Sequence, residues 1–304
     1  MQTILPIFLI IILGAFFFRI KLARYEWVEV LNEFVVRIGF PSLILSSLIK
    51  LDWDPQIHGR ILLVNSVFIL SCFGLALLVS KAFRLESRLK RTLFLSFAYG
   101  NIAYIGIPVI ERFLGEQYLP EASLITAVYL VWLFSVGMIY LEYSKTGEFN
   151  SKKVFLSLIK NPLIVAVLLG IIILGLQIKL PVIVTKPLEM IATSVTPVIL
   201  FSIGIFFGSS NLGKLRDWRN ALLLVIFVLA IKPFLLFLGV KLFSLSIPVF
   251  HASILDAAMP IALTPFALSK DFDLDANFLA KAIVLSTAIS LISLSLWNSL
   301  LLGL

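Results

Sequence analysis

The chain has 304 residues, of which 60% are hydrophobic and 14% are charged, and its formal net charge is +8. A soluble domain of this size carries about a quarter charged residues, so a mean hydropathy of +1.07 predicts an all-α membrane protein with many spans. A soluble protein with one anchor is excluded because apolar runs fill the whole length. The basic residues lie in short loops, so we expect no nucleic-acid partner.

Enzyme and metal chemistry find no support in the sequence. Cys72 is the single cysteine, so neither an intrachain disulfide nor a cysteine metal site is possible. His58 and His251 lack metal-ligand spacing, and no phosphate-binding glycine loop or nucleophile–base pair occurs. We therefore expect no catalytic residue, no metal and no cofactor.

Apolar segments long enough to cross the roughly 30 Å of a bilayer follow one another along the chain. The first, which begins at Ile4, lacks the basic start and the small-residue cleavage site of a signal peptide, so we interpret it as a retained span. The ten predicted spans are residues 3–19, 30–50, 61–82, 92–112, 121–142, 154–176, 187–208, 219–243, 248–269 and 279–302.

Lys and Arg are distributed unevenly between the loops. One set of alternate loops is rich in both, around residues 19–24, 81–91, 145–160, 214–219 and 270–281. The other set holds Lys50, Arg60, Arg112, Lys179 and Lys186. The rich set is cytoplasmic by the positive-inside rule. We therefore expect a multi-pass protein of a cell membrane, plasma or bacterial inner, with both termini outside.

The fourth and ninth predicted spans are interrupted at their centres, by GNIAYIGIP (Gly100 to Pro108) and by DAAMPIALTP (Asp256 to Pro265). Proline removes a backbone donor and clashes with the preceding turn, and glycine permits unusual dihedrals. Interrupted spans at corresponding places in two halves are typical of the binding site of a secondary transporter. Free amide groups at the start of a half-helix favour an anion. Two simple proline kinks are the alternative.

The residues of these two breaks are the candidate substrate-binding residues. Asn101 brings two amide donors and a carbonyl acceptor to the depth of the bilayer. With it we place Tyr104, Gly106 and Pro108 of the first break, and Met259, Pro260, Thr264 and Pro265 of the second.

Asp256 and Lys232 are charged residues within predicted spans. A carboxylate inside a span costs about 2.5–3.5 kcal/mol on insertion scales and usually serves an ion or proton pathway. We therefore expect both residues to act in coupling or gating. The alternatives are that Asp256 lies at the outer interface, and that Lys232 forms a structural ion pair, attracts an anion or snorkels.

The two halves of the chain carry a repeat signal. A shift of 156 residues aligns five pairs without a gap, namely Pro6 with Pro162, Gly14 with Gly170, Glu33 with Glu189, Pro41 with Pro197 and Ser46 with Ser202. Because each half has five predicted spans, an odd number, the two copies must be inserted with opposite topology. We therefore predict two inverted five-helix repeats, residues 1–145 and 150–304. Chance recurrence of prolines in membrane helices is the alternative.

The residues around both breaks resemble the auxin efflux carrier family, also called PIN-like carriers, of the bile acid/sodium symporter-like superfamily. The stretches that carry the resemblance are NIAYIGIPVIERFLGEQY, DAAMPIALTPFALSKDFDLD and, in the second span, LNEFVVRIGFPSLILSSL. The likeness implies a scaffold of spans 1, 2, 6 and 7 and a moving transport unit of spans 3–5 and 8–10. It also implies a homodimer, elevator-like alternating access, and a carboxylate held by Asn101 and the half-helix ends near Pro108 and Pro260.

Two features depart from the plant members of that family. They carry a long cytoplasmic loop between spans 5 and 6, which is short here. They also place an Asp and, four residues on, a Lys in the third span, where this chain has Asn65 and Ile69. Asn65 is therefore added to the candidate binding residues, and the substrate is expected to be an auxin-like or another carboxylate.

The main hypothesis is thus a carrier for a small organic anion, with the lipid bilayer as its surroundings. A sodium-coupled symporter of the bile-acid type is the first alternative, and its cation ligands would come from Asn101, Thr264 and the serines of the last span, Ser286, Ser290 and Ser293. A membrane receptor that binds a ligand without transporting it is the second.

Overall fold

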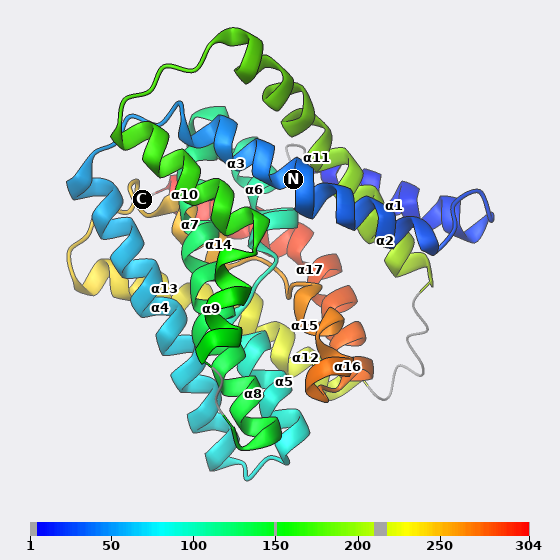
Figure 1. Ribbon diagram of the computed structural model, residues 1–304. Coiled ribbons are helices and arrows are strands. Elements are labelled where there is room, and N and C mark those ends of the chain that lie inside the picture. The colour runs from blue at the N-terminus through cyan, green and yellow to red at the C-terminus, as the bar shows by residue number, and fades with distance from the viewer. Residues whose placement is uncertain (1–4, 149–150, 210–217, 304) are drawn as a thin grey trace. The chain divides into compact units, whose positions relative to one another are not determined.

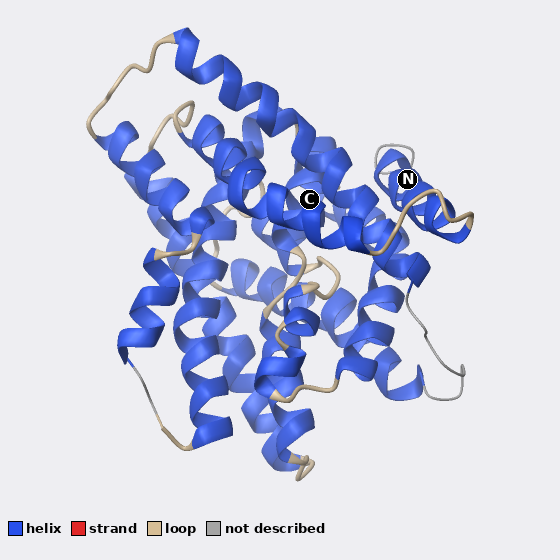
Figure 2. Ribbon diagram, turned by 45° about the vertical axis from the view of Figure 1, so that its right-hand side comes forward, coloured by secondary structure: helices blue, strands red, loops and turns tan. Residues whose placement is uncertain are grey.

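The computed structural model of the protein describes residues 5–148, 151–209 and 218–303. Within these ranges every regular element is a helix, as Figure 2 shows, and the β-type pairing is an isolated bridge between Gly100 and Ile261. The prediction of an all-α protein is confirmed for this part of the chain. Three parts of the predictions lie outside it: residues 3–4 of the first predicted span, 149–150 in the predicted basic loop 145–160, and 214–217 of another basic loop.

Figure 1 shows the helices coloured in chain order. The first half contains α1 (Leu5–Arg19), α2 (Glu26–Phe34), α3 (Phe40–Leu48), α4 (Pro55–Ala82), α5 (Ser87–Ala98), α6 (Ile107–Leu114), α7 (Leu119–Trp132) and α8 (Met138–Thr146). The second half contains α9 (Ser151–Ile159), α10 (Pro162–Gly175), α11 (Val182–Ser209), α12 (Arg219–Ile226), α13 (Lys232–Leu242), α14 (His251–Ala257), α15 (Thr264–Ala267), α16 (Ser269–Phe272) and α17 (Ala276–Leu302).

Several of these helices are long and apolar enough to cross a membrane, which makes the protein a multi-pass membrane protein. Five helical stretches of the described chain meet this criterion: Pro55–Ala82, Glu116–Thr146, Val182–Ser209, Arg219–Leu242 and Ala276–Leu302. The helices α1 and α10 are shorter but also apolar. The predicted spans 30–50, 92–112 and 248–269 consist of shorter helical pieces, so the count of ten spans stays a prediction.

Proline explains where several helices depart from α geometry. The π-helical turns Val35–Gly39, Ile102–Gly106 and Phe227–Ile231 each end two residues before a proline. Proline has no N–H for the carbonyl four residues earlier, and one wider turn accommodates its ring. Such turns are frequent at functional sites, and the third of them immediately precedes Lys232.

By its internal contacts the chain divides into two compact units. The first unit consists of Met1–His58, Ala103–Ala127 and Ile159–Asn211. The second consists of Gly59–Ile102, Val128–Leu158 and Leu212–Leu304. Both units therefore combine segments from the two halves of the sequence.

In the first unit, α1 and α11 pack with their backbones in contact. A Cβ added to Gly14 would collide with the carbonyl oxygen of Phe201, and a Cβ added to Gly204 would collide with that of Ile11. Small residues permit this kind of close approach between membrane helices. The Phe17 ring meets the Phe201 ring edge-on, with 5.7 Å between their centroids.

The second contact surface of the first unit joins α10 and α11 to α3. A Cβ on Gly170 would lie 2.8 Å from a methyl carbon of Leu48, so α10 also approaches closely. At the end of α3, Lys50 forms an ion pair of 2.6 Å with Glu189 of α11.

In the second unit, α17 packs against α12, α14 and α15, and α13 packs against α14. Stacked aromatic rings fill the interior between the other helices. Phe94 of α5 stacks on Phe73 of α4 with 4.5 Å between centroids, and Phe97 stacks on Phe227 at 4.0 Å. This packing fixes α5 and α14, the helices that lead into the two breaks.

Candidate functional site

The two broken segments meet within the second unit. The helix α5 ends at Ala98, and the Asn101 N–H donates to the Pro260 carbonyl oxygen at 2.6 Å. The Ala262 N–H donates to the Tyr99 carbonyl oxygen at 3.4 Å. Backbone groups that each helix leaves free at its interruption are thus satisfied by the other segment, as an apolar surrounding requires.

Gly100 is the residue that allows the two chains to approach. It pairs with Ile261 in an antiparallel bridge. A Cβ at this position would lie 3.2 Å from the Met259 carbonyl oxygen and 3.3 Å from Lys232 Nζ. A larger residue would therefore push against both the opposite backbone and a buried ammonium group.

The last helix supports the crossing through Ser286, which is fully buried. The Ile261 N–H donates to Ser286 Oγ at 3.1 Å, and the same hydroxyl donates to the Ile283 carbonyl oxygen at 3.1 Å. Ser290 Oγ donates to the Thr287 carbonyl oxygen at 2.8 Å. Ser286 therefore joins α17 to the crossing, whereas the Ser290 bond lies within α17.

Asn65 ties α4 to α14. Its Nδ2 donates to Ser253 Oγ at 2.8 Å and to the Ile61 carbonyl oxygen at 2.9 Å. Its Oδ1 is buried and has no hydrogen-bond partner among the described residues. The structure thus places Asn65 beside the turn that precedes Asp256, with one acceptor atom available.

Asp256 and Lys232 are both buried in protein, at 0% and 1% exposure. Burial of this degree excludes snorkelling for Lys232, while the depth of Asp256 in the membrane stays a prediction. The Lys232 ammonium interacts electrostatically with Asp256 and with Cys72, and Asp256 also acts on Tyr129. The two charges therefore belong to one interior cluster, next to the crossing.

The remaining residues of the first break lie in the first unit. The Tyr104 ring stacks on Phe40, with 5.4 Å between centroids and an interplanar angle of 15°. Gly106 and Pro108 are buried, and α6 begins at Ile107. The predicted set of site residues is thus shared between the two units, with Asn65, Asn101 and the second break in the other one.

The second break falls inside the predicted stretch Asp256 to Pro265, but the helix that follows it differs from the prediction. Between α14 and α15 the chain has no helix from Ala258 to Leu263, and Met259 and Pro260 are buried there. Thr264 begins a helix of four residues, with Pro265 buried in its first turn. The predicted second half-helix of this span is therefore two very short helices, α15 and α16.

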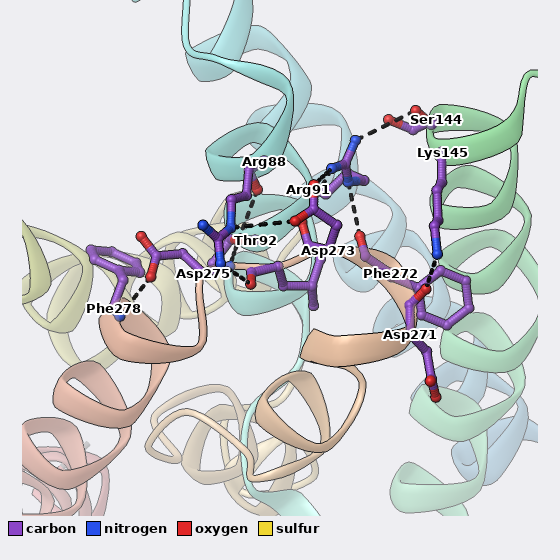
Figure 3. A network of polar contacts seen from close by, with 11 residues as sticks. Arg88, Arg91, Thr92, Ser144, Lys145, Asp271, Phe272, Asp273, Asp275 and Phe278 are labelled. Carbon is purple, nitrogen blue, oxygen red and sulfur yellow. Dashed lines mark hydrogen bonds and ion pairs between the residues drawn. The ribbon is translucent and has the colours of Figure 1, made fainter. Parts of the chain in front are cut away.

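Sequence reasoning missed a polar network around Arg91 (Figure 3). The buried Arg91 side chain donates from Nε to the Phe272 carbonyl oxygen at 3.0 Å and from Nη2 to Asp273 Oδ2 at 2.6 Å. The Asp275 N–H donates to Thr92 Oγ1 at 2.9 Å. This network fastens the start of α5 to the loop between α16 and α17. The only signal in the sequence was the basic run around residue 90, which we interpreted as topology.

The chain is similar to known membrane transport proteins. Residues 1–298 match the model of a family described as membrane transport protein. An uncharacterized transporter of Methanocaldococcus jannaschii is 25% identical over 100% of this chain and 99% of its own length. One of Methanothermobacter thermautotrophicus is 25% identical over 99% of this chain and 98% of its own length.

A plant protein is similar over a shorter stretch. The auxin efflux carrier component 8 of Arabidopsis thaliana is 24% identical over 46% of this chain and 39% of its own length. The family and the two archaeal relatives are transporters rather than enzymes. The resemblance seen around the two breaks is thereby confirmed. The chain belongs to the membrane transport protein family, which includes carriers of the auxin efflux type.

Proposed function

We propose that the protein is a secondary carrier that moves a small organic anion, with the carboxylate of the substrate held at the crossing of the two broken segments. The observation that carries this proposal is the bond between Asn101 and Pro260, at the point where both helices are interrupted. Irregular backbone at this depth is tolerated where it lines a cavity or is buried in protein. Paired interruptions are the usual construction of a carrier's binding site.

The chemistry of the crossing favours an anion. The buried Lys232 Nζ lies beside Gly100 without a hydrogen-bond partner in the described chain, and an ammonium group is a strong donor to a carboxylate. The Asn101 amide adds neutral donors. Asn65 Oδ1 offers an acceptor for a hydroxyl or N–H of the same substrate. We assign coupling or gating to Asp256 and Lys232.

The proposed architecture is ten spans in two inverted five-helix repeats. Its support comes from which helices pack together. In the first unit, the first span packs on the seventh (α1 on α11) and the sixth packs on the second (α10 on α3). In the proposed repeats, span 1 corresponds to span 6 and span 2 to span 7. The contact of span 1 with span 7 therefore corresponds to the contact of span 6 with span 2. Gly14 and Gly170, which the 156-residue shift aligns, lie at one close approach each.

The second unit follows the same rule. The third span contacts the ninth through Asn65 and Ser253, and the eighth contacts the fourth through Lys232 and Gly100. The fourth and ninth spans contact each other. Span 3 corresponds to span 8, and span 4 corresponds to span 9. Each of these contacts in one repeat therefore has its counterpart in the other, as two structural repeats require.

An elevator mechanism needs a scaffold and a moving part. The first unit contains spans 1, 2 and 7 and most of span 6. The second contains spans 3, 8, 9 and 10, most of span 5 and the first half of span 4. This division supports the proposed scaffold and transport unit, with residues 103–127 grouped with the scaffold. We further propose a homodimer through the scaffold, in a cell membrane with both termini outside.

The substrate is proposed to be an auxin-like compound or another small carboxylate. The name of the Arabidopsis relative describes an auxin efflux carrier, and a compound of that class is therefore one member of the test panel. The rest of the panel should vary the apolar body while the carboxylate is kept, because the crossing recognises the charged group.

Counterflow in proteoliposomes tests the proposal and separates a carrier from a receptor. Labelled benzoate, indole-3-acetate and dicarboxylates are offered outside vesicles loaded with the unlabelled compound. We expect accumulation of at least one of them in the wild type, a loss of about tenfold or more in Asn101→Ala, and little change in Ser71→Ala, a substitution on the exposed face of α4. No counterflow of any carboxylate contradicts the proposal.

A further inference from the structure

The turn between α1 and α2 concentrates positive charge. Arg19, Lys21 and Arg24 fall within six positions, and no carboxylate lies between them. All three residues are exposed, and none belongs to an ion pair among the residues that the structure describes. With Phe18 and Ala23 they line an open cavity of about 440 Å³. This volume lies within the range of about 300–1,000 Å³ that small-molecule sites occupy.

The backbone of this turn is held by its own hydrogen bonds. The helix α1 ends at Arg19, and Lys21 has the left-handed φ, 61°, that often follows a helix end. The N–H groups of Leu22 and Ala23 both donate to the Phe17 carbonyl oxygen, at 2.9 and 3.1 Å. The turn therefore presents its three cations from an ordered backbone, which lowers the ordering cost of binding a ligand.

The turn is also anchored within the first unit. Ala23, which is 3% exposed, packs in a buried cluster with Val28 of α2 and Ile205 of α11. Phe17 and Phe18 of α1 pack against the same cluster. The cavity thus belongs to the first unit, whereas the two broken segments meet in the second. An inference about the cavity does not depend on which compound is transported.

Apolar and aromatic side chains are exposed next to the cations. Ile20 and Leu22 alternate with the basic residues along the turn, and both are exposed. Phe16 in the last turn of α1 is exposed as well, and so are Tyr25 and Trp27 after the cations. Exposed Trp and Tyr are typical of the level at which a membrane helix meets the lipid head groups. A ligand that fits this surface therefore combines negative charge with apolar chains.

We propose that this cavity binds the phosphate head group of an anionic phospholipid. The guanidinium groups of Arg19 and Arg24 suit a phosphate because each offers paired N–H donors, and the Lys21 ammonium adds a third positive charge. The acyl chains lie along the apolar surface that contains Phe16 and Ile20. The turn belongs to the loops predicted to be cytoplasmic, and anionic lipids make that surface of a membrane negative. A lipid held here ties the first unit, the proposed scaffold, to one leaflet.

Native mass spectrometry of the whole protein in a neutral detergent measures the binding. The probes are dioleoyl phosphatidylglycerol, whose head group carries a net negative charge, and dioleoyl phosphatidylcholine, whose phosphate is balanced by a quaternary ammonium. We expect phosphatidylglycerol to bind about tenfold or more tightly than phosphatidylcholine, because only its head group adds negative charge to the three cations. Equal affinities for the two lipids would overturn the proposal.

Neutral variants of the turn locate the bound lipid. A basic side chain near an anionic lipid contributes about fivefold in affinity, so Lys21→Gln should weaken phosphatidylglycerol binding about fivefold. The triple variant Arg19→Gln, Lys21→Gln and Arg24→Gln should weaken it about a hundredfold. Because all three residues are exposed, the unfolding midpoint should stay close to that of the wild type. A folded triple variant that binds phosphatidylglycerol as tightly as the wild type would overturn the proposal.

Two controls separate the cavity from a general effect of charge. The first removes three charges from the next basic segment of the chain, by Lys81→Gln, Arg84→Gln and Lys90→Gln, and should keep the wild-type affinity. The second is Glu26→Gln, which removes a carboxylate from the first turn of α2 and should not weaken binding. Equal losses in the two triple variants, or weaker binding in Glu26→Gln, would contradict the assigned site.

A competition arm separates a lipid from a free phosphate compound. Inorganic phosphate and glycerol 3-phosphate are added in large excess to the protein with bound phosphatidylglycerol. We expect neither to displace the lipid, because neither has the acyl chains whose burial adds to its affinity. Displacement by either one would assign the cavity to a free phosphate compound and contradict the lipid. These readouts do not involve transport, so they can fail while carboxylate counterflow succeeds, and the reverse.

Discussion

The Asn101 N–H and the Pro260 carbonyl oxygen, 159 positions apart in the sequence, form a hydrogen bond of 2.6 Å. Each belongs to a segment that proline and glycine prevent from continuing as a helix. Their bond joins the two interruptions, while Ser286 holds the adjacent Ile261 N–H. The account of transport depends on this junction, and the following predictions probe its parts.

Gly100→Ala should disturb the junction directly. The added Cβ would lie 3.2 Å from the Met259 carbonyl oxygen, closer than most real contacts, so we expect a loss of about 1–3 kcal/mol in stability and of most transport. Gly74→Ala on α4 is the matched control, because no neighbouring atom lies within 4 Å of its Cβ position. Thermal unfolding and counterflow check both variants, and equal effects in the two would contradict the assigned contact.

Asn65→Ala separates two roles of this amide. The substitution removes the bond to Ser253 and the available Oδ1 acceptor, so we expect about 1–2 kcal/mol of destabilisation together with a raised KM for the substrate. Ser253→Ala removes the bond and keeps the acceptor, so it should destabilise with a smaller change in KM. Concentration-dependent counterflow measures the difference, and equal KM values in the two variants would remove Asn65 from the substrate site.

Arg91→Ala should destabilise the second unit away from the crossing. The substitution abolishes charge-assisted bonds from the buried Arg91 guanidinium to the Phe272 carbonyl oxygen and to Asp273, so we expect a loss of about 2–3 kcal/mol. Arg88→Ala should cost less than about 1 kcal/mol, because its ion pair with Asp273 is longer, at 3.6 Å, and more exposed. The order of the two unfolding midpoints is the measurement, and a reversed order would contradict the network of Figure 3.

Gly204→Ala should separate α1 from α11. The new Cβ would collide with the Ile11 carbonyl oxygen, a backbone atom that cannot turn aside, so we expect a loss of about 2 kcal/mol or more. Gly175→Ala, at the end of α10, has open space around its Cβ position and should leave stability within about 0.5 kcal/mol. Thermal unfolding of both variants in detergent decides whether this contact stabilises the first unit.

Local rules predict the parts of this fold that depend on single residues. Proline and glycine at Gly100 and Pro260 indicate where helices must break, and apolar runs indicate where helices form. The pairing of Gly100 with Ile261 is outside the reach of such rules, because its register is set by the packing of α5, α14 and α17. The same holds for Asp256, whose position at an interface or in the interior no sequence pattern decides.

Long-range polar contacts are the larger omission. Arg91 bonds to Asp273, which is 182 positions away in the sequence. The sequence of a basic run does not indicate whether one of its arginines faces solvent or bonds to the end of another helix. The short helices α15 and α16 were missed for a different reason. The apolar run predicts that the ninth span continues to Ser269, but Pro265 and the left-handed Asp273, with φ of 49°, limit the helix to two separate turns.

Locating a bound carboxylate tests the central claim most directly. A density map of the protein in lipid nanodiscs with 4-bromobenzoate, or with whichever brominated carboxylate shows counterflow, would place the heavy atom. We predict density for the carboxylate beside Asn101 and Lys232, with residues 99–101 and 258–263 outside any helix. A carboxylate located away from the crossing, or two continuous helices through both stretches, would contradict the account.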